Sequence, residues 1–130
     1  MGGRAVREIL FRGKCNEVGK YNGQWIEGFY GEDDGKPIIA RSTDHGLIGY
    51  FCELDSIGQY TGLTDKNGKK VFEGDVIVVS TSEKGKTKKY RVEFDNGIFG
   101  IRFLAHAYNN TIIPLRSFDY IETIKGEEND

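Results

Sequence analysis

The chain of 130 residues is 38% hydrophobic, 12% aromatic and 29% charged, which excludes a disordered chain because enough apolar surface is present to form a core. Its formal net charge of -2 excludes a nucleic-acid binder that depends on overall positive charge. Eighteen glycines against two prolines favour many short strands over a few long helices, so we predict a mainly β fold.

The first half of the chain predicts a series of β-hairpins. The segment "REILFRGK" (residues 7–14) is expected to pair with "GQWIEGFY" (residues 23–30), and an Asp-Gly turn then leads into "KPIIAR" (residues 36–41). A further apolar strand follows in "GLIGYFCEL" (residues 46–54). No segment keeps a 3.6-residue periodicity, so we expect at most one short helical turn, near residues 55–58.

Four Asn-Gly or Asp-Gly steps, at residues 22–23, 34–35, 67–68 and 96–97, predict type I′ turns, which need positive φ at both central residues. The last step lies in the middle of "YRVEFDNGIFGIRF" (residues 90–103), where apolar and charged residues alternate on both sides of the turn. The predicted cross-strand pairs on the apolar face are Phe94 with Phe99, Val92 with Ile101, and Tyr90 with Phe103. The charged residues then share the other face: Arg91, Glu93, Asp95 and Arg102.

The second half of the chain predicts closely spaced strands. "FEGDVIVVS" (residues 72–80) is typical of a buried strand, and "NTIIPL" and "FDYIETI" supply the last two. Pro114 indicates that its strand lies at a sheet edge or ends there. The best boundary is at residues 58–62, which divides the chain into an N-terminal β region, 1–62, and a C-terminal small barrel with a short acidic tail, 63–130.

Four segments together resemble the YopX family of bacteriophage and prophage proteins. They are "REILFRGK", "GQWIEGFY", "GQYTGLTDKNGKKVFEGDVI" (residues 58–77) and "YRVEFDNGIFGI", and the resemblance runs from residue 7 to about residue 124. It implies a mainly β protein with an SH3-like barrel in its C-terminal part, assembled as a homo-oligomer and encoded by phage or prophage DNA. It implies no catalytic residue, no metal and no cofactor.

The long central segment is best interpreted as scaffold. Its Asn67-Gly68 step favours a tight turn, and Val71 and Phe72 are expected to return the chain to the core. The carboxylate of Asp75 is expected to accept hydrogen bonds from neighbouring backbone N–H groups at a sharp bend.

Residues suited to catalysis are few, so we expect no enzyme. The two histidines, His45 and His106, lie in no recognisable catalytic pattern, and Cys15 and Cys52 form no CxxC pair. We expect two buried, reduced thiols; a disulfide between them and a catalytic cysteine assisted by His45 are the weaker alternatives. The acidic segment "GEDDGK" lacks the spacing of a calcium loop and is interpreted as a solvated hairpin tip.

One basic segment, "KGKTKKYR", is the candidate nucleic-acid-binding site. Its basic residues, with no acid among them, are Lys84, Lys86, Lys88, Lys89 and Arg91. Tyr90 is expected to face inward. The alternative is that these lysines keep a loop soluble and protect strand ends from edge pairing. Trp25, the single tryptophan, is expected in the core or at a subunit interface.

The function hypothesis is a non-enzymatic, homo-oligomeric module that binds an unidentified host or phage protein. We expect it in the bacterial cytoplasm and not in a membrane, because the sequence shows neither a signal peptide nor an apolar run of spanning length. The alternative function is a nucleic-acid-binding small barrel that uses the segment from Lys84 to Arg91.

Overall fold

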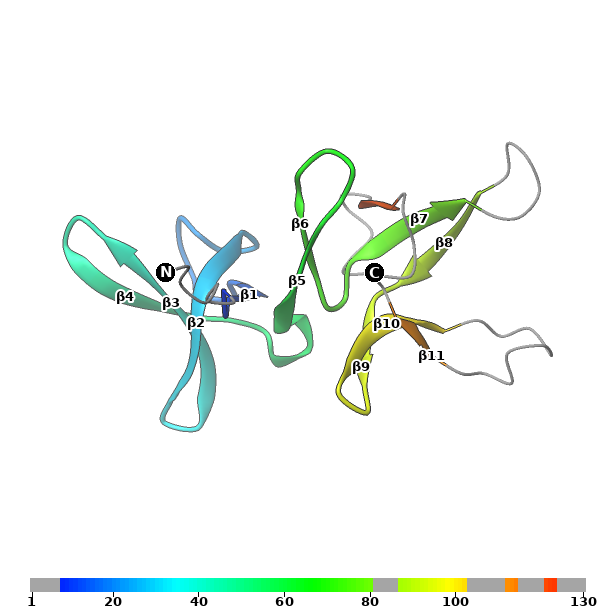
Figure 1. The fold of residues 1–130 in the computed structure, drawn as a ribbon. Coiled ribbons are helices and arrows are strands. Elements are labelled where there is room, and N and C mark those ends of the chain that lie inside the picture. Colours follow the sequence, from blue (N-terminus) through cyan, green and yellow to red (C-terminus); the bar gives the residue numbers. More distant parts are fainter. Residues whose placement is uncertain (1–7, 81–86, 103–111, 115–120, 124–130) are drawn as a thin grey trace, which may run out of the picture. The chain divides into compact units, whose positions relative to one another are not determined.

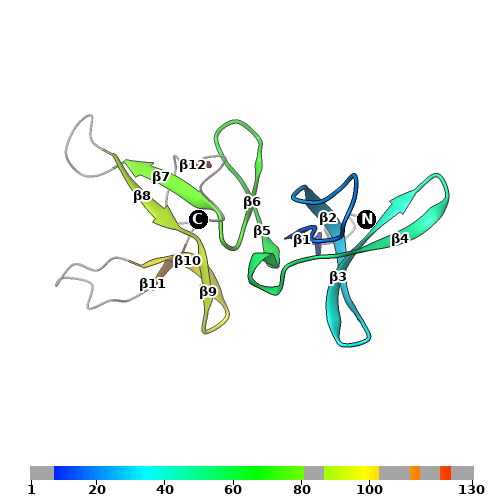
Figure 2. The same ribbon diagram turned by 180° about the vertical axis from the view of Figure 1, so that it is seen from behind.

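The computed structural model describes residues 8–80, 87–102, 112–114 and 121–123. These residues form antiparallel strands and one short 3-10 helix, so the predicted mainly β fold is confirmed (Figures 1 and 2). The chain divides into two compact units, Met1–Gly62 and Leu63–Asp130. Each unit has a hydrophobic core of its own.

The strands of the first unit belong to an antiparallel sheet with the order β4-β3-β2-β1-β5-β6, in which β6 covers Lys70–Phe72. The helix η1 (Leu54–Ser56) lies between β4 and β5 along the chain, close to the predicted helical turn. The two hairpins predicted in this half are confirmed by the pairing of β1 with β2 and of β2 with β3, and the further predicted strand, β4, pairs with β3. The strands are β1 (Phe11–Lys14), β2 (Trp25–Asp33), β3 (Lys36–Thr43), β4 (Gly46–Phe51) and β5 (Gly58–Thr64).

One face of this sheet carries the core of the first unit. Directly opposed residues of antiparallel strands share a face, and the register pairs Ile39 with Tyr50. The core contains Cys15, Ile26, Ile39, Tyr50 and Cys52, and the partly buried Phe11, Tyr21 and Ile57 pack against it. The other face, called here the outer face, holds Phe29, Ala40 and Gly49, which lie side by side on β2, β3 and β4.

A glycine marks the point where β2 changes its partner. Gly28 pairs with Phe11 of β1, whereas the next residue, Phe29, pairs with Ala40 of β3. A Cβ atom at Gly28 would collide with the carbonyl oxygen of Ala40. A residue without a side chain is therefore needed where the backbones of β2 and β3 approach each other.

The second unit contains two three-stranded antiparallel sheets, of order β12-β7-β8 and β11-β10-β9. Pro114 lies on β11, an edge strand, as predicted. The arrangement as an SH3-like barrel stays a prediction. The strands are β6 (Lys70–Phe72), β7 (Val76–Ser80), β8 (Thr87–Arg91), β9 (Glu93–Asp95), β10 (Ile98–Arg102), β11 (Ile112–Pro114) and β12 (Ile121–Thr123).

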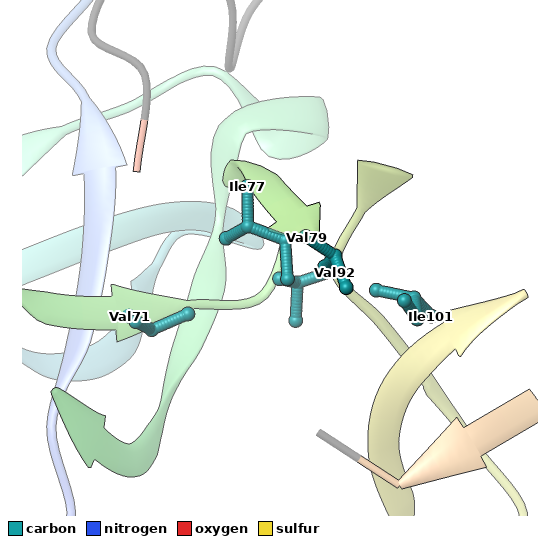
Figure 3. Close-up of a cluster of buried hydrophobic side chains, with 5 residues drawn as sticks. All are labelled: Val71, Ile77, Val79, Val92 and Ile101. Atoms are coloured by element: carbon teal, nitrogen blue, oxygen red, sulfur yellow. The ribbon is translucent and has the colours of Figure 1, made fainter. Parts of the chain in front are cut away.

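The core of the second unit is aliphatic. Figure 3 shows its five buried side chains: Val71, Ile77, Val79, Val92 and Ile101. They come from β6, from β7, from the break between β8 and β9, and from β10. Leu63 and Tyr90 are partly buried against them. The expected inward orientation of Tyr90 is thus confirmed.

The predicted hairpin at residues 90–103 is confirmed near its turn, and Val92 and Ile101 lie in one core cluster as the predicted apolar face requires, but the predicted continuous strand is interrupted at Val92. Phe94 pairs with Phe99, and Asn96 and Gly97 have φ values of 52° and 78°. The strand does not continue through Val92, because the backbone N–H of Val92 donates to the carbonyl of Asp75 at 2.8 Å. Before this break β8 pairs with β7, and after it β9 pairs with β10. Phe103 lies outside the described residues.

Two of the four predicted type I′ turns are found. The step at residues 34–35 has positive φ at both positions, like the step at 96–97. At residues 22–23 and 67–68 only the glycine has positive φ, so the type I′ prediction is wrong there. These two turns are held by other hydrogen bonds, including those that Asn22 donates from its side chain to Glu17 and that Asp65 accepts from the backbone N–H of Asn67.

Candidate interaction surfaces

Two buried carboxylates hold the bends of the central segment. Asp65 Oδ1 accepts hydrogen bonds from the backbone N–H groups of Asn67 and Lys69 at 2.8 and 2.9 Å. Asp75 Oδ2 accepts one from the backbone N–H of Phe72 at 2.8 Å, as predicted. Because these carboxylates bond to the turns they belong to, the geometry supports a structural role for this segment.

The two cysteines oppose each other in the core of the first unit. Cys15 and Cys52 form an antiparallel bridge, and both are buried free thiols. Burial, and then the neighbouring Cys15, raises the pKa of Cys52 to about 11. A buried thiol that keeps its proton at neutral pH is a weak nucleophile. His45 is exposed in the turn before β4, at the opposite end of that strand from Cys52, and His106 lies outside the described residues.

The acidic segment forms the tip of the β2–β3 hairpin. Glu32, Asp33 and Asp34 are exposed, and Asp34 occupies the first central position of the turn. Among the residues that the structure describes, no three His, Cys, Asp or Glu side chains are grouped so that they could hold a metal ion. The geometry agrees with a solvated hairpin tip at this position.

The candidate nucleic-acid-binding segment is described in part. Lys84 and Lys86 lie outside the described residues, whereas Lys88, Lys89 and Arg91 are exposed on β8. Strand alternation places Lys89 and Arg91 on one face of β8 and Lys88 on the other. Arg91 donates from Nη1 to the carbonyl of Gly74 at 2.9 Å. The structure therefore places three of the five basic residues on one edge strand, although not on one face.

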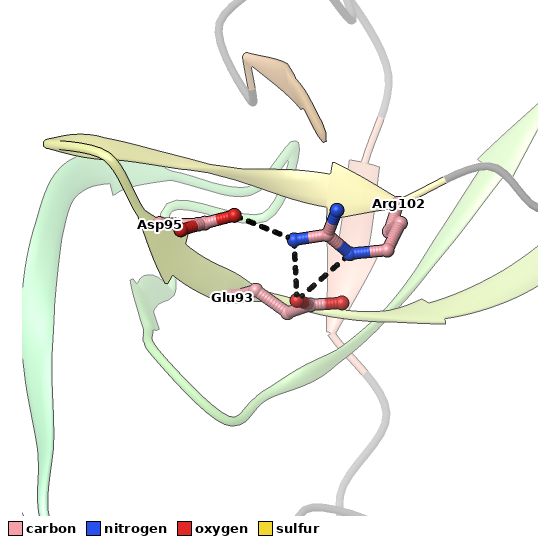
Figure 4. A network of polar contacts seen from close by, with 3 residues as sticks. All are labelled: Glu93, Asp95 and Arg102. Atoms are coloured by element: carbon pink, nitrogen blue, oxygen red, sulfur yellow. Dashed lines mark hydrogen bonds and ion pairs between the residues drawn. The ribbon is translucent and has the colours of Figure 1, made fainter. Parts of the chain in front are cut away.

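Arg102, a basic residue outside the candidate segment, is paired with two acidic side chains and therefore adds no net positive charge to the surface of the second unit. Arg102 Nη2 lies 2.9 Å from Asp95 Oδ2 and 3.2 Å from Glu93 Oε1, as Figure 4 shows. Hydrogen bonds to Asp95 and then Glu93 raise the pKa of Arg102. The prediction that these three charged residues share a face of the β9–β10 hairpin is confirmed.

The outer face of the first unit carries exposed apolar side chains on β2 and β4, whereas Arg12 and Glu27 are charged residues of the same face. Phe29 is 59% exposed and Leu47 is 63% exposed, and both lie on this face because Phe29 aligns with Gly49 and Leu47 follows two residues away on β4. Ile38, Ala40 and Phe51 of the same face are partly exposed. Sequence reasoning missed this surface, because an apolar run such as "GLIGYF" does not indicate which of its residues face the core.

Trp25 lies on the outer face and not in the core. It is half-buried, and the guanidinium carbon of Arg12 lies 4.4 Å from the centre of its ring. Arg12 and Trp25 therefore form a cation–π pair. The core position of Trp25 is wrong, because the core cluster of the first unit is built from the opposite face of β2, and the subunit-interface position stays a prediction.

Comparison with known proteins gives a family match. A family model described as YopX protein matches residues 10–124 and so extends over both units. No curated protein matches the sequence. Within the described segments, no helix has the length and hydrophobicity that crossing a membrane would require.

Proposed function

The chain belongs to the YopX family, and from this premise we propose that it is a non-enzymatic, homo-oligomeric module that binds other proteins. We propose further that it is encoded by a phage or prophage and acts in the bacterial cytoplasm on a host or phage protein. The observation that carries the proposal is the set of exposed apolar side chains on the outer face of the first unit, with Phe29 and Leu47 more than half exposed. Large exposed apolar surfaces in soluble proteins mark sites of protein association.

A binding role also agrees with the placement of the reactive groups. The thiols of Cys15 and Cys52 are buried. Asp65 and Asp75 accept hydrogen bonds from their own turns, and His45 lies in an exposed turn of its own. These groups are thus used for packing and for turn formation, which supports a protein that acts through its surface.

The proposal is tested by the mass of the protein in solution. Sedimentation velocity across the micromolar range is expected to show an average mass that rises from one chain toward a multiple of it. A second measurement immobilises the wild-type protein and the variants Phe29→Lys and Leu54→Lys, and compares the proteins that each retains from host lysate. Leu54 is exposed on η1, so its variant is a control with the same change in charge. A mass of one chain at every concentration, together with equal retention by all three proteins, would contradict the proposal.

Nucleic-acid binding through the basic segment is the second candidate. It is supported by the exposure of Lys88, Lys89 and Arg91 on the edge strand β8. Phosphate contacts by such residues are expected to weaken steeply with salt. The measurement is fluorescence anisotropy of labelled single-stranded and duplex DNA, at low salt and near physiological salt.

A matched pair of variants identifies the segment responsible. The double variant Lys88→Ala and Lys89→Ala is compared with Lys20→Ala and Lys36→Ala, which removes two exposed lysines from the first unit. If the basic segment binds DNA, the first double variant loses affinity and the second keeps it. Equal affinities of the two variants would exclude Lys88 and Lys89 as the binding residues.

A further inference from the structure

The edge strand β4 differs from the other sheet edges that the described residues form. Edge strands are commonly protected from pairing with other chains by charged residues or proline. Where the side chains of the other edge strands are described, each strand has such a residue: Lys70 on β6, Lys88 on β8, Glu93 on β9 and Pro114 on β11. The sequence of β4, GLIGYF, has neither. This edge is therefore open to pairing with another strand.

Hydrogen-bond directions define which groups of β4 face outward. The N–H of Cys52 donates to the carbonyl of Pro37 on β3 at 3.1 Å. Because every second residue of an antiparallel strand bonds to the same neighbour, the backbone groups of Tyr50 and Ile48 also bond to β3. Leu47, Gly49 and Phe51 then direct their backbone groups away from the sheet.

The outward groups of Phe51 already have partners. Its N–H donates to Glu17 Oε2 at 2.7 Å, and its carbonyl accepts from the N–H of Asn16 at 3.0 Å. Within the described residues, no partner is found for the outward N–H and C=O groups of Leu47 and Gly49, and both residues are exposed. Leu47 and Gly49 can therefore still form backbone hydrogen bonds on this edge, and Ile48 lies between them.

We propose that β4 pairs antiparallel with β4 of a second copy of this chain, about a two-fold axis at Ile48. In this register Leu47 and the partner's Gly49 exchange both backbone hydrogen bonds, and Gly49 and the partner's Leu47 do the same. Ile48 faces the partner's Ile48 as a non-hydrogen-bonded pair. This inference rests on the proposed homo-oligomeric function and names the surface that would carry it.

The side chains of β4 favour a second copy as the occupant. The register sets Leu47 opposite the partner's Gly49 and Tyr50 opposite the partner's Gly46, so a large side chain meets a glycine on each side of the axis. No charged residue lies within the strand, so no like charges meet near the axis. The exposed apolar side chains of the outer face would continue from one copy into the other.

A charge on the edge tests the surface. We expect Leu47→Lys to raise the dissociation constant of the oligomer at least about tenfold, because each axis then carries two lysines close together. Leu54→Lys is the matched control, since Leu54 is an exposed leucine outside β4 and is 68% exposed compared with 63% for Leu47. The control is expected to keep the wild-type constant. Circular dichroism shows whether wild type, Leu47→Lys and Leu54→Lys are folded, and sedimentation velocity measures the mass of each.

Cysteine trapping tests the register. In Ile48→Cys the two new thiols oppose each other in a non-hydrogen-bonded pair, where Cα atoms lie about 4.5 Å apart and within disulfide range. Oxidised glutathione takes up the two electrons and two protons that the thiols release, and a dimer linked by a disulfide is expected on a non-reducing gel. Leu47→Cys, with the partner's Gly49 opposite, is expected to give at least about fivefold less of it.

The outcomes separate this inference from the proposed function. If wild-type protein keeps a mass of one chain, the homo-oligomer itself is wrong. If wild-type protein associates and neither Leu47→Lys nor Ile48→Cys behaves as expected, the oligomer stands and its assignment to β4 is wrong. A third outcome is a wild-type protein that is a monomer but binds a different protein, which Leu47→Lys no longer binds. The β4 edge is then a docking site for that protein, and the second copy as its occupant is wrong.

Discussion

The two units of this protein are stabilised by different kinds of core. The second unit buries an aliphatic cluster of valine and isoleucine, and its bends depend on the buried carboxylates Asp65 and Asp75. The first unit includes two thiols and a tyrosine in its core and leaves Phe29 and Leu47 exposed on the outer face. Among the described residues, exposed large apolar side chains are more numerous in the first unit, although Phe94 of the second unit is 49% exposed.

Removing a core side chain from the second unit is expected to have the largest effect. Ile77 is fully buried, so Ile77→Ala should lower the free energy of unfolding by about 3 kcal/mol through lost contacts and a cavity. The comparison with Ile77 uses the exposed Leu47 of the first unit, where Leu47→Ala should change the free energy of unfolding by less than about 0.5 kcal/mol. Urea denaturation at low protein concentration measures both. Similar losses for the two variants would contradict the comparison.

Removing the carboxylate of Asp75 is expected to have the next largest effect. Asp75→Ala leaves the buried N–H of Phe72 without its acceptor and should cost about 2 kcal/mol. Asp33→Ala, at the exposed β2–β3 tip of the first unit, is the control and should be close to neutral. Thermal unfolding followed by circular dichroism measures the difference. Equal melting temperatures for Asp75→Ala and wild type would show that the bend does not depend on this carboxylate.

Alkaline pH is expected to act on the core of the first unit through Cys52. Its folded pKa is raised from 9.0 to about 11, so between these values the unfolded chain releases the proton first and stability falls as pH rises. The raised pKa of Cys52 contributes on the order of 2 kcal/mol to the free energy of unfolding, and this contribution is fully present below pH 9. Urea denaturation of wild type and Cys52→Ala at pH 8 and pH 11 isolates it, because the other titrating groups are common to both. An equal pH dependence of the two proteins would assign the loss to those other groups.

The smallest effect is expected at a feature that the units share. Gly35 of the first unit and Gly97 of the second occupy the same position of a type I′ turn, with φ values of 76° and 78°. Gly35→Ala and Gly97→Ala should each cost about 1 kcal/mol, because a Cβ atom is disfavoured at positive φ. Denaturation curves of the two variants give the costs. Markedly unequal values would show that the surroundings of the turns, and not the turn geometry, decide the cost.

Much of the fold could be predicted from local sequence. The hairpins of the first half, the edge position of Pro114 and the turns at residues 34–35 and 96–97 follow from alternation and from the conformational preferences of Gly, Pro and Asn. The prediction of a continuous strand failed at Val92, because its backbone hydrogen bonds go to the bend at residues 74–75, which is remote in sequence. Local patterns contain no information on that partner.

The sequence by itself determined the family, the strands and the charge of the basic segment. The tertiary structure alone decided which sheet each strand joins, that Cys15 faces Cys52, and that Leu47 and Gly49 of β4 turn their backbone groups outward. The physical reason is that side-chain alternation and turn geometry are local properties, whereas an open edge depends on which strand is absent beside it.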